Sequence, residues 1–522
     1  MLMCKHAGFL FFAAALNAMS GCKATQTTNA PSVTESAEPA KPAVNPEMAS
    51  LTSTVPLGKW GPLLQWPIVA VHMGLTPDGK VILWDRDDAN DIPNKKYDSQ
   101  SIYLWNPSDS TFAKYPLGTT NLFCAGATWA SGGLLYVFGG HFAVNSGSAA
   151  INYFDTKTNV WNAGPTMNAG RWYATSVPLG TGEILALGGL TKSGVVNTLP
   201  QILDPKTNTL RNLPGGIFGY PMWPRGFQTS SGLVITVGPD PIARYIDPTP
   251  GPTAAKIRTA ATPPFALWRS NGTAAMYDVD KILMVGGYNG TVNTYPNVPA
   301  YATNVAMDLQ IGATPDAISW KIVPPMAFRR AQAVATVLPT GEVIIVGGSQ
   351  VDGTLKTNVN IVKIPEIWNP TTKVFTKMAA MIDARLYHST AMLLPDGSVL
   401  SAGGGTPSQF GPDRKTAQIF YPPYLFAGPR PTIVSVPKTL TFNQNFDMTV
   451  TGTISQISLM RAGMVTHAFD QSQRRIPLAF TQVGNTLAVK APLNGNYAPP
   501  GHYMLFVIGD NGVPSIAAIV NI

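Results

Sequence analysis

The stretch LLYVFGG, residues 134–140, is a short apolar run that ends in a pair of glycines. Similar runs recur along the chain as EILALGG (183–189), LVITVGP (233–239), KILMVGG (281–287), EVIIVGG (342–348) and SVLSAGG (398–404). A diverged copy, KVILWD, lies at 80–85 and brings the number of copies to seven. The spacing, mostly about fifty residues with two longer intervals, indicates an internal repeat.

A second pattern, two short strands joined by a turn, follows several of these runs. Examples are LWNPSDSTF (104–112), YFDTKTNVW (153–161), LDPKTNTL (203–210) and EIWNPTTKVF (366–375). Units of about fifty residues with a di-glycine strand end are typical of kelch repeats, whose four-stranded blades stack around an axis. The sequence therefore predicts an all-β protein with a seven-bladed kelch-type β-propeller at residues 58–425. A large β-sandwich would not explain the period.

After about Tyr421 the repeat ends and a shorter alternation begins. Apolar segments such as FDMTVTG, LAVKAP and YMLFVIG alternate with turns up to the last residue. This pattern predicts a small immunoglobulin-like β-sandwich at residues 426–522. The region has no cysteine pair, so the immunoglobulin label describes architecture only.

The composition is that of a turn-rich globular protein. The chain has 522 residues, with 49 glycines, 46 prolines and a formal net charge of +8. No run of lysine and arginine is present, which argues against a nucleic-acid partner. Ordinary solubility explains the charge, and an attraction to anionic glycans stays open.

The N-terminus predicts export. A basic start, the apolar stretch GFLFFAAAL and small residues precede Cys22, and the stretch is too short for a spanning helix. We interpret residues 1–21 as a signal peptide that resembles the bacterial lipoprotein type. Lipidated Cys22 would then anchor the protein to the cell envelope, with plain secretion as the alternative. Residues 22–57, rich in Ser, Thr, Ala and Pro, are predicted to be a disordered linker.

The repeat provides a register for its polar residues. Cys124 and Tyr173 each lie 15 residues before the first glycine of their repeat, and Tyr387 lies 16 before Gly403. The same position in the other repeats falls on Val69, Trp223, Asn271 and Gln332. Equivalent positions in a propeller form a ring around the axis. We therefore expect Cys124 and Tyr173 to face one another from neighbouring blades, with Tyr387 and the adjacent His388 across the ring.

Two histidines and two tyrosines suggest a metal site. Tyr387 and His388 are neighbours, and a regular strand would send them to opposite faces, so we expect an irregular strand start there. His467 lies in THAFDQSQRRIPL (466–478), a polar segment unlike a core. A nitrogen and oxygen ligand set suits Cu(II) better than zinc. Other candidate histidines, which no pattern places near the ring, are His72, His141 and His502.

With these features the chain resembles the copper radical oxidases, the family of galactose oxidase and glyoxal oxidase. The resemblance runs from about Trp66 to the C-terminus. It is carried by NLFCAGATW, GRWYATS, ARLYHSTAMLLPDGSVLSAGGG, AQIFYPPYLF, THAFDQSQRRIPL and PPGHYMLFVIGDNGVPS. It implies an oxidoreductase that acts on an aldehyde, a primary alcohol or a surface glycan and reduces O2 to hydrogen peroxide.

The resemblance also implies residue roles around one copper ion. Cys124 and Tyr173 would form a thioether crosslink, and Tyr173 would be an equatorial ligand and the radical site. Tyr387 would be the axial ligand, and His388 and His467 the imidazole ligands. One copper ion cycles by one electron, so the protein-derived Tyr-Cys radical would accept the second electron of a two-electron oxidation.

The chain departs from galactose oxidase near the predicted crosslink. Galactose oxidase carries a stacked tryptophan just after the corresponding glycine pair, whereas residues 190–191 here are leucine and threonine. Its N-terminal carbohydrate-binding domain has no counterpart before the propeller. A glyoxal-oxidase-like activity is therefore expected rather than strict galactose oxidation, with aldehyde against alcohol left open. The candidate substrate contacts are Trp172, Trp223, Arg269, Arg329 and Arg330, and either tryptophan could instead cover the crosslink.

A non-catalytic alternative is a kelch-propeller surface lipoprotein that binds glycan or protein. Such a protein would tolerate loss of any member of the predicted site. All five members are present, which favours the enzyme. They are Cys124, Tyr173, Tyr387, His388 and His467.

Overall fold

The computed structural model describes residues 56–86, 101–116, 120–249, 257–261, 268–288, 301–351, 360–405 and 412–522. The predicted signal peptide, Cys22 and the linker up to residue 55 lie outside this part, so export and lipidation stay predictions. Within it, regular structure is β-strand apart from three 3-10 turns, η3 (Ser131–Gly133), η4 (Pro214–Gly216) and η5 (Pro423–Phe426). None of the helical turns in the same residues has the length and apolar character needed to cross a bilayer.

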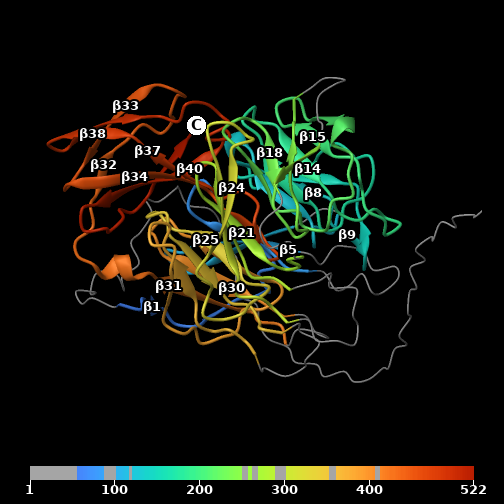
Figure 1. Cartoon of the computed structure of the whole chain (residues 1–522), viewed down its shortest axis with the longest axis horizontal. Helices are drawn as coiled ribbons and strands as arrows, with labels where there is room; N and C mark the ends of the chain where they lie inside the picture. Colours follow the sequence, from blue (N-terminus) through green and yellow to red (C-terminus); the bar gives the residue numbers. More distant parts are fainter. Residues whose placement is uncertain are drawn as a thin grey trace, which may run out of the picture. The chain divides into compact units, whose positions relative to one another are not determined.

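Seven antiparallel sheets follow one another in the first part of the described chain (Figure 1). The first has β3 (His72–Leu75), β4 (Val81–Trp84), β5 (Ser101–Trp105) and β6 (Phe112–Pro116). The second has β7 (Gly126–Trp129), β8 (Leu134–Phe138), β11 (Ile151–Asp155) and β12 (Val160–Ala163). The third has β13 (Thr175–Pro178), β14 (Ile184–Leu187), β15 (Gln201–Asp204) and β16 (Thr209–Asn212).

The remaining sheets repeat this plan. The fourth has β17 (Gly226–Gln228), β18 (Val234–Thr236), β19 (Ala243–Ile246) and β20 (Arg258–Ala261). The fifth has β21 (Thr273–Asp278), β22 (Lys281–Val285), β23 (Ala306–Ile311) and β24 (Ile318–Val323). The sixth has β25 (Val334–Val337), β26 (Val343–Val346), β27 (Glu366–Trp368) and β28 (Phe375–Lys377). The seventh joins β29 (Ser389–Leu393), β30 (Val399–Gly403) and β31 (Thr416–Tyr421) to the N-terminal β1 (Lys59–Trp60) and β2 (Leu64–Gln65).

Contacts between neighbouring sheets close a ring. Between the first and second sheets, the Trp84 indole N–H donates to the Leu122 carbonyl at 3.2 Å. β7 contacts β13, β13 contacts β17, β21 contacts β25, β25 contacts β29, and β29 returns to β3. Between the fourth and fifth sheets, the Arg225 guanidinium donates to the Gly272 carbonyl at 2.7 Å. The apolar run of each repeat is the second strand of its sheet, buried along its whole length in β14 and β26. This arrangement confirms the predicted all-β propeller.

The glycine pair of the repeat allows close approach of the next blade. A Cβ on Gly139, whose φ is +80°, would lie 2.1 Å from the Arg171 carbonyl oxygen, so only glycine fits. The Gly140 N–H donates to the same carbonyl at 3.2 Å. The Arg171 guanidinium in turn donates to the Gly188 carbonyl of its own sheet at 2.8 Å. Glycine and arginine together therefore fix the contact between successive blades.

The C-terminal part forms a sandwich of two four-stranded sheets, which lie together in orange and red in Figure 1. One sheet has β32 (Ile433–Ser435), β33 (Asn445–Val450), β39 (Thr486–Lys490) and β38 (Phe480–Val483). The other has β37 (Arg475–Leu478), β34 (Ile454–Arg461), β40 (His502–Gly509) and β41 (Ala518–Asn521). Their shared apolar core includes Val450, Leu459, Leu487, Leu505 and Val507. The sandwich prediction is confirmed, while the domain limit at 425/426 stays a prediction.

Two short strands leave the sandwich and extend the first propeller sheet. β35 (Met464–Thr466) pairs antiparallel with β3, with Thr466 opposite His72, and β36 (Phe469–Asp470) pairs with β35. The buried Asp470 carboxylate accepts the main-chain N–H of Met464 at 2.9 Å and that of Gln473 at 2.8 Å. These bonds hold the β35–β36 turn at the inner edge of the propeller.

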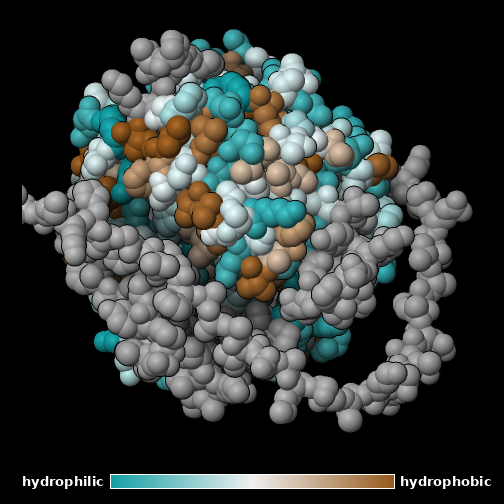
Figure 2. Space-filling model, turned by 90° about the vertical axis from the view of Figure 1, so that its right-hand side faces the viewer, coloured by the Kyte–Doolittle hydropathy of each residue, from teal (hydrophilic) through white to brown (hydrophobic). Residues whose placement is uncertain are grey.

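A two-stranded hairpin, β9 (His141–Ala143) and β10 (Ser146–Gly147), stands apart from the seven sheets. It carries the exposed side chains of Phe142 and Val144. On the face shown in Figure 2, hydrophobic residues lie in small groups among hydrophilic ones. Single exposed apolar side chains of this kind are ordinary on protein surfaces.

Candidate metal centre

Six residues before the first strands of successive sheets share one unusual backbone conformation. Their φ angles lie between 52° and 68°, at Cys124, Tyr173, Trp223, Asn271, Gln332 and His388. The Tyr173 N–H donates to the Cys124 carbonyl at 2.9 Å, and the Trp223 N–H donates to the Tyr173 carbonyl at 3.1 Å. Positive φ is uncommon outside glycine and persists where the surroundings enforce it. The first five of these positions are those that the repeat spacing predicts.

The sixth position belongs to His388, which corrects the register based on Tyr387. His388 lies 15 residues before Gly403, as Cys124 does before its glycine pair, and its φ is 67°. β29 begins only at Ser389, so strand alternation does not apply to either residue. The two side chains lie together, with ring centroids 3.9 Å apart.

The hydrogen bonds of His388 leave one ring nitrogen available. Its Nδ1 lies 3.1 Å from the Gly405 carbonyl oxygen, which can only accept, so Nδ1 carries the proton. Nε2 then has a lone pair, is buried, and has no hydrogen-bond partner among the described residues. Burial, with the positive charge of Arg86, lowers the pKa of His388 to about 3, so the imidazole is neutral near pH 7.

His467 is held in the same tautomer by a neighbouring hydroxyl. Thr466 Oγ1 donates to the Val71 carbonyl at 3.0 Å, so it accepts from His467 Nδ1, 2.6 Å away. His467 Nε2 therefore keeps its lone pair, and it lies 3.7 Å from the Cys124 sulfur. Burial, followed by the nearby His388 and His72, lowers the pKa of His467 well below its usual value.

Two phenols complete the cluster. The hydroxyl oxygens of Tyr173 and Tyr387 are in direct hydrogen-bond contact. The His467 ring centroid lies 5.0 Å from that of Tyr173, 5.4 Å from that of Tyr387 and 4.8 Å from that of His388. The structure thus brings all five predicted residues to one place, from blades two, three and seven and from the β35–β36 turn.

The donor set fits a cation that accepts nitrogen and oxygen ligands. Burial raises the pKa of Tyr173 and Tyr387, so without a positive charge both phenols stay protonated. A bound cation would reverse this preference, because it stabilises phenolate. Among the described residues no cluster of three or more His, Cys, Asp or Glu side chains could hold a metal. A metal site here therefore depends on the phenols, and its N/O set suits Cu(II).

Comparison with known proteins gives the family. Residues 267–424 match the glyoxal oxidase N-terminus, residues 430–522 the galactose oxidase-like early set domain, and residues 127–168 the kelch motif. The chain is 28% identical over 504 residues to a galactose oxidase of Gibberella zeae, covering 91% of this chain and 72% of that one. This chain belongs to the copper radical oxidase family of galactose oxidase and glyoxal oxidase.

Two further relatives agree with this family. An aldehyde oxidase GLOX of Vitis pseudoreticulata is 27% identical over 399 residues, covering 68% of this chain and 72% of the relative. A solved fungal alcohol oxidase of the AA5 family, in complex with copper, superposes with a TM-score of 0.77 at 25% identity. That comparison covers 89% of this chain and 99% of the fungal one.

In this family member two indoles stack on the Tyr173 ring. The Trp172 centroid lies 3.8 Å from it with the planes 10° apart, and the Trp223 centroid lies 4.9 Å away at 28°. Two indoles this close and this parallel to one ring would collide on the same side, so they cover opposite faces. Trp223 also stacks on His467 at 4.6 Å. Both indoles are almost fully buried, in keeping with the covering role that the sequence left open.

Trp172 is paired through its backbone with Leu190. Leu190, which follows the glycine pair, exchanges two main-chain hydrogen bonds of 2.8 Å with Trp172. The Trp172 indole N–H donates to His141 Nδ1 at 3.2 Å. The residue paired with Leu190 is thus the tryptophan that stacks on Tyr173.

Two of the three arginines predicted to contact substrate form contacts inside the propeller. The Arg330 guanidinium is buried, forms an ion pair with Glu366 at 2.6 Å and donates to the Gly347 carbonyl at 3.1 Å. Arg269 is also buried and donates to the Gly286 carbonyl at 3.1 Å. These contacts brace the glycine pairs as Arg171 does, and a substrate contact by either arginine stays a prediction. Arg329 is exposed, and no described contact joins it to the candidate centre.

The sequence named His72 as a candidate without placing it near the centre, and it gave no role to Phe123. His72 stacks on Trp84 at 4.6 Å and lies 5.9 Å from His467, and neither of its ring nitrogens has a partner among the described residues. Phe123 lies 5.3 Å from His388. The only signal for Phe123 is its position beside Cys124. His72 lies near His467 because β3 pairs with β35, and no local sequence pattern predicts that pairing.

Proposed function

We propose that this protein is a copper radical oxidase that oxidises an aldehyde or a primary alcohol and reduces O2 to hydrogen peroxide. One observation supports the proposal: two imidazoles with a free Nε2 lone pair, two phenols and the propeller's only cysteine lie together in one buried cluster. His388 and His467 would hold copper through Nε2, and Tyr173 and Tyr387 through their hydroxyl oxygens. When bound, copper supplies a one-electron oxidant and a charge that favours phenolate.

Cys124 and Tyr173 are proposed to form the thioether cofactor. A carbon–sulfur bond forms between Cys124 Sγ and the ring carbon next to the Tyr173 hydroxyl, and one S–H and one C–H bond break. The two hydrogens, with their electrons, pass to O2 and leave as hydrogen peroxide. Sulfur on the ring donates electron density and lowers the oxidation potential of Tyr173. Tyr173 then serves as the second one-electron acceptor.

Turnover would use the two tyrosines in different roles. Tyr387 phenolate accepts the substrate hydroxyl proton as a general base. The Tyr173 radical takes a hydrogen atom from the adjoining carbon. The one remaining electron would pass to bound copper, so that the alcohol loses two protons and two electrons in all and becomes an aldehyde. O2 gains two protons and two electrons and becomes hydrogen peroxide. An aldehyde reacts as its hydrate and becomes a carboxylic acid. The stacked indoles of Trp172 and Trp223 keep water from both faces of the Tyr173 ring.

A glyoxal-oxidase-like preference is proposed for the substrate. It is supported by the match of residues 267–424 to the glyoxal oxidase N-terminus and by the absence of tryptophan at position 190. Small aldehydes and primary alcohols are the first candidates, and a surface glycan is the third. Export, with a lipid anchor on Cys22, is proposed from the N-terminal sequence alone.

Copper reconstitution tests the proposal. The copper-loaded protein should release peroxide with at least one member of a panel of aldehydes and primary alcohols. Intact mass should fall by two hydrogens after loading, and the Cys124→Ser variant should show no such loss. A protein that binds one copper, keeps its mass and releases no peroxide from any panel member would contradict the oxidase. That result would favour the kelch-propeller lipoprotein that binds glycan or protein.

A further inference from the structure

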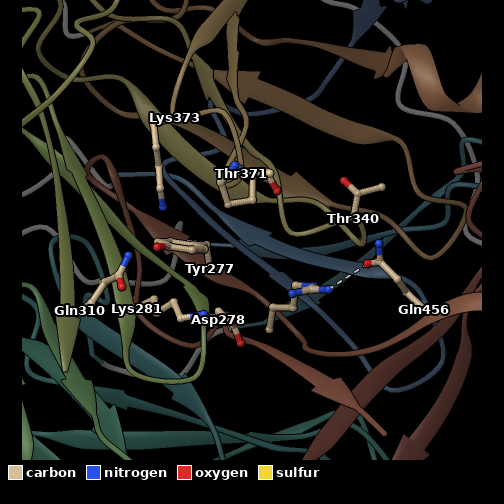
Figure 3. Close-up of a pocket in the computed structure, with 10 residues that line it drawn as sticks. Tyr277, Asp278, Lys281, Gln310, Thr340, Thr371, Lys373 and Gln456 are labelled. Atoms are coloured by element: carbon tan, nitrogen blue, oxygen red, sulfur yellow. Dashed lines mark hydrogen bonds and ion pairs between the residues drawn. The ribbon is translucent and has the colours of Figure 1, made fainter. Parts of the chain in front are cut away.

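Apart from the candidate metal centre, a polar cavity lies where the fifth and sixth propeller sheets meet the sandwich (Figure 3). Its volume is about 280 Å³. Strands β21 to β23 contribute one side, loops of the sixth sheet a second, and β34 and β37 a third. The lining residues are Tyr277, Asp278, Lys281, Gln310, Thr340, Pro370, Thr371, Lys373, Gln456 and Arg475.

Two of the three lining cations already have carboxylate partners. Lys281 pairs with Asp278 at 2.9 Å, and Lys373 pairs with Asp308 at 2.9 Å. The buried Asp308 carboxylate also accepts from the Tyr277 hydroxyl at 2.7 Å and from the Gln310 amide at 2.8 Å. Asp308 therefore holds three of the lining side chains in place before any ligand arrives.

Arg475 is the lining cation that forms no ion pair among the described residues, although the Asp278 carboxylate, already paired with Lys281, also acts on its charge. Its side chain is 8% exposed, and its guanidinium donates to the Pro339 carbonyl at 3.2 Å, the Ser458 hydroxyl at 2.9 Å and the Gln456 amide oxygen at 3.2 Å. The last of these is the dashed line in Figure 3. All three acceptors are uncharged, and no carboxylate of the described residues forms an ion pair with Arg475. A buried guanidinium whose only nearby carboxylate is shared with Lys281 is incompletely compensated, so the cavity favours one anionic group beside Arg475.

The rest of the lining suits a hydroxylated ligand. Gln310 and Gln456 offer amides, and Thr340 and Thr371 offer hydroxyls. Such side chains, on three different elements, match the hydroxyls around a sugar ring. The volume lies just under the range of about 300–1,000 Å³ that holds drug-sized ligands, so it suits a single sugar unit.

We propose that this cavity binds one sugar-acid residue, a pyranose with a single carboxylate placed against Arg475. The proposed copper centre is a separate cluster built from other residues, so the cavity would act as a non-catalytic saccharide site. A surface rich in acidic glycan would then hold the protein close to its substrates. The inference does not depend on the oxidase activity.

Calorimetry on the copper-loaded protein tests the proposal with methyl glucuronide. This probe has neither an aldehyde nor a primary alcohol, so the proposed oxidase cannot consume it. Methyl xyloside is the matched neutral probe, since it lacks the carboxylate and also lacks a primary alcohol. Methyl glucuronide should bind at least about ten-fold more tightly than either methyl xyloside or acetate, because a charge-assisted bond and the hydroxyl contacts both contribute. Equal affinity for the neutral sugar, or for acetate alone, overturns the proposal.

Two variants locate the binding. Arg475→Gln removes the charge and should weaken methyl glucuronide binding at least about ten-fold. Because Arg475 is buried and its loss could unfold the sandwich, Thr371→Trp provides a second approach, filling the cavity from an exposed position. Thr371→Trp should abolish binding and leave peroxide release unchanged, while the exposed Lys157→Gln should change neither. Methyl glucuronide binding that survives Thr371→Trp overturns the assignment, whatever the outcome of the oxidase test.

Discussion

The ring of positive-φ residues has two kinds of member. Three members, Cys124, Tyr173 and His388, join the candidate centre, and Trp223 stacks on it. Asn271 and Gln332 share the backbone conformation without any described side-chain hydrogen bond or ring contact to the centre. The repeated fold therefore provides the same geometry in successive blades. A candidate metal centre forms only where these positions carry a cysteine, tyrosine or histidine and where the β35–β36 turn adds His467. The predictions below test this contrast between the two kinds of ring position.

The largest effect is expected for His388→Asn. Asparagine tolerates the left-handed backbone but is too short to reach the centre, so one of four proposed ligands is lost. Copper affinity should fall by about 1,000-fold or more, because each ligand supplies several kcal/mol of a metal site. Competition titration with a copper chelator measures this. Asn271→Gly, the matched change at an inactive ring position, should leave copper affinity unchanged, and an equal loss there would break the contrast.

A large but different effect is expected for Cys124→Ser. Copper should still bind, because none of the four proposed ligands is altered. Peroxide release should fall about 100-fold or more, since every 59 mV or so added to a one-electron potential shifts its equilibrium about tenfold. Intact mass and a peroxide assay on the same copper-loaded sample separate the two effects. A crosslink-free protein with full activity would contradict the assigned role.

A moderate effect is expected at Thr466. Thr466→Val keeps the shape but removes the hydroxyl that holds the His467 tautomer, so copper affinity should fall about 10–100-fold. Thr466→Ser keeps the hydroxyl and should retain affinity within about threefold. Chelator competition on both variants provides the measurement. If valine and serine behave alike, the hydroxyl has no positioning role.

A smaller effect is expected for Trp172→Phe. The aromatic stack on Tyr173 survives in part, while the indole hydrogen bond to His141 is lost. That bond is worth about 0.5–1.5 kcal/mol, so the lifetime of the Tyr173 radical should fall about two- to tenfold. Decay of the radical absorbance after oxidation measures it. Trp161→Phe, in the outer strand β12, should leave the lifetime unchanged.

The smallest effect is expected for Gln332→Leu. Both polar atoms of the Gln332 side chain are buried without a partner among the described residues. An apolar residue of similar shape removes that cost, so thermal stability should be equal or higher. Peroxide release should stay within about twofold, since the residue takes no part in the proposed centre. A melting curve and the peroxide assay check both points, and a sharp loss of activity would place Gln332 in the active half of the ring.

The sequence by itself determined the propeller, the sandwich and most of the ring. The period near fifty residues and the glycine pairs can be read directly from the sequence. Each blade repeats them because its glycine pair must approach the backbone of the next blade, as Gly139 approaches Arg171. The same count located Cys124 and Tyr173, and it missed His388 by one residue where an irregular strand start shifts the register. The family resemblance, and not the spacing, supplied the expectation that His467 joins them.

Only the tertiary structure decided which side chains meet. His467 reaches the ring because β35 pairs with β3, across most of the chain, and such long-range pairing leaves no periodic mark in the sequence. The sequence suggested Arg269 and Arg330 as substrate contacts, whereas the structure buries both side chains. Their burial could not be predicted, because it depends on neighbours from distant parts of the chain. That Arg475 forms no ion pair of its own likewise appears only once Asp278 and Asp308 are seen to be paired with other cations.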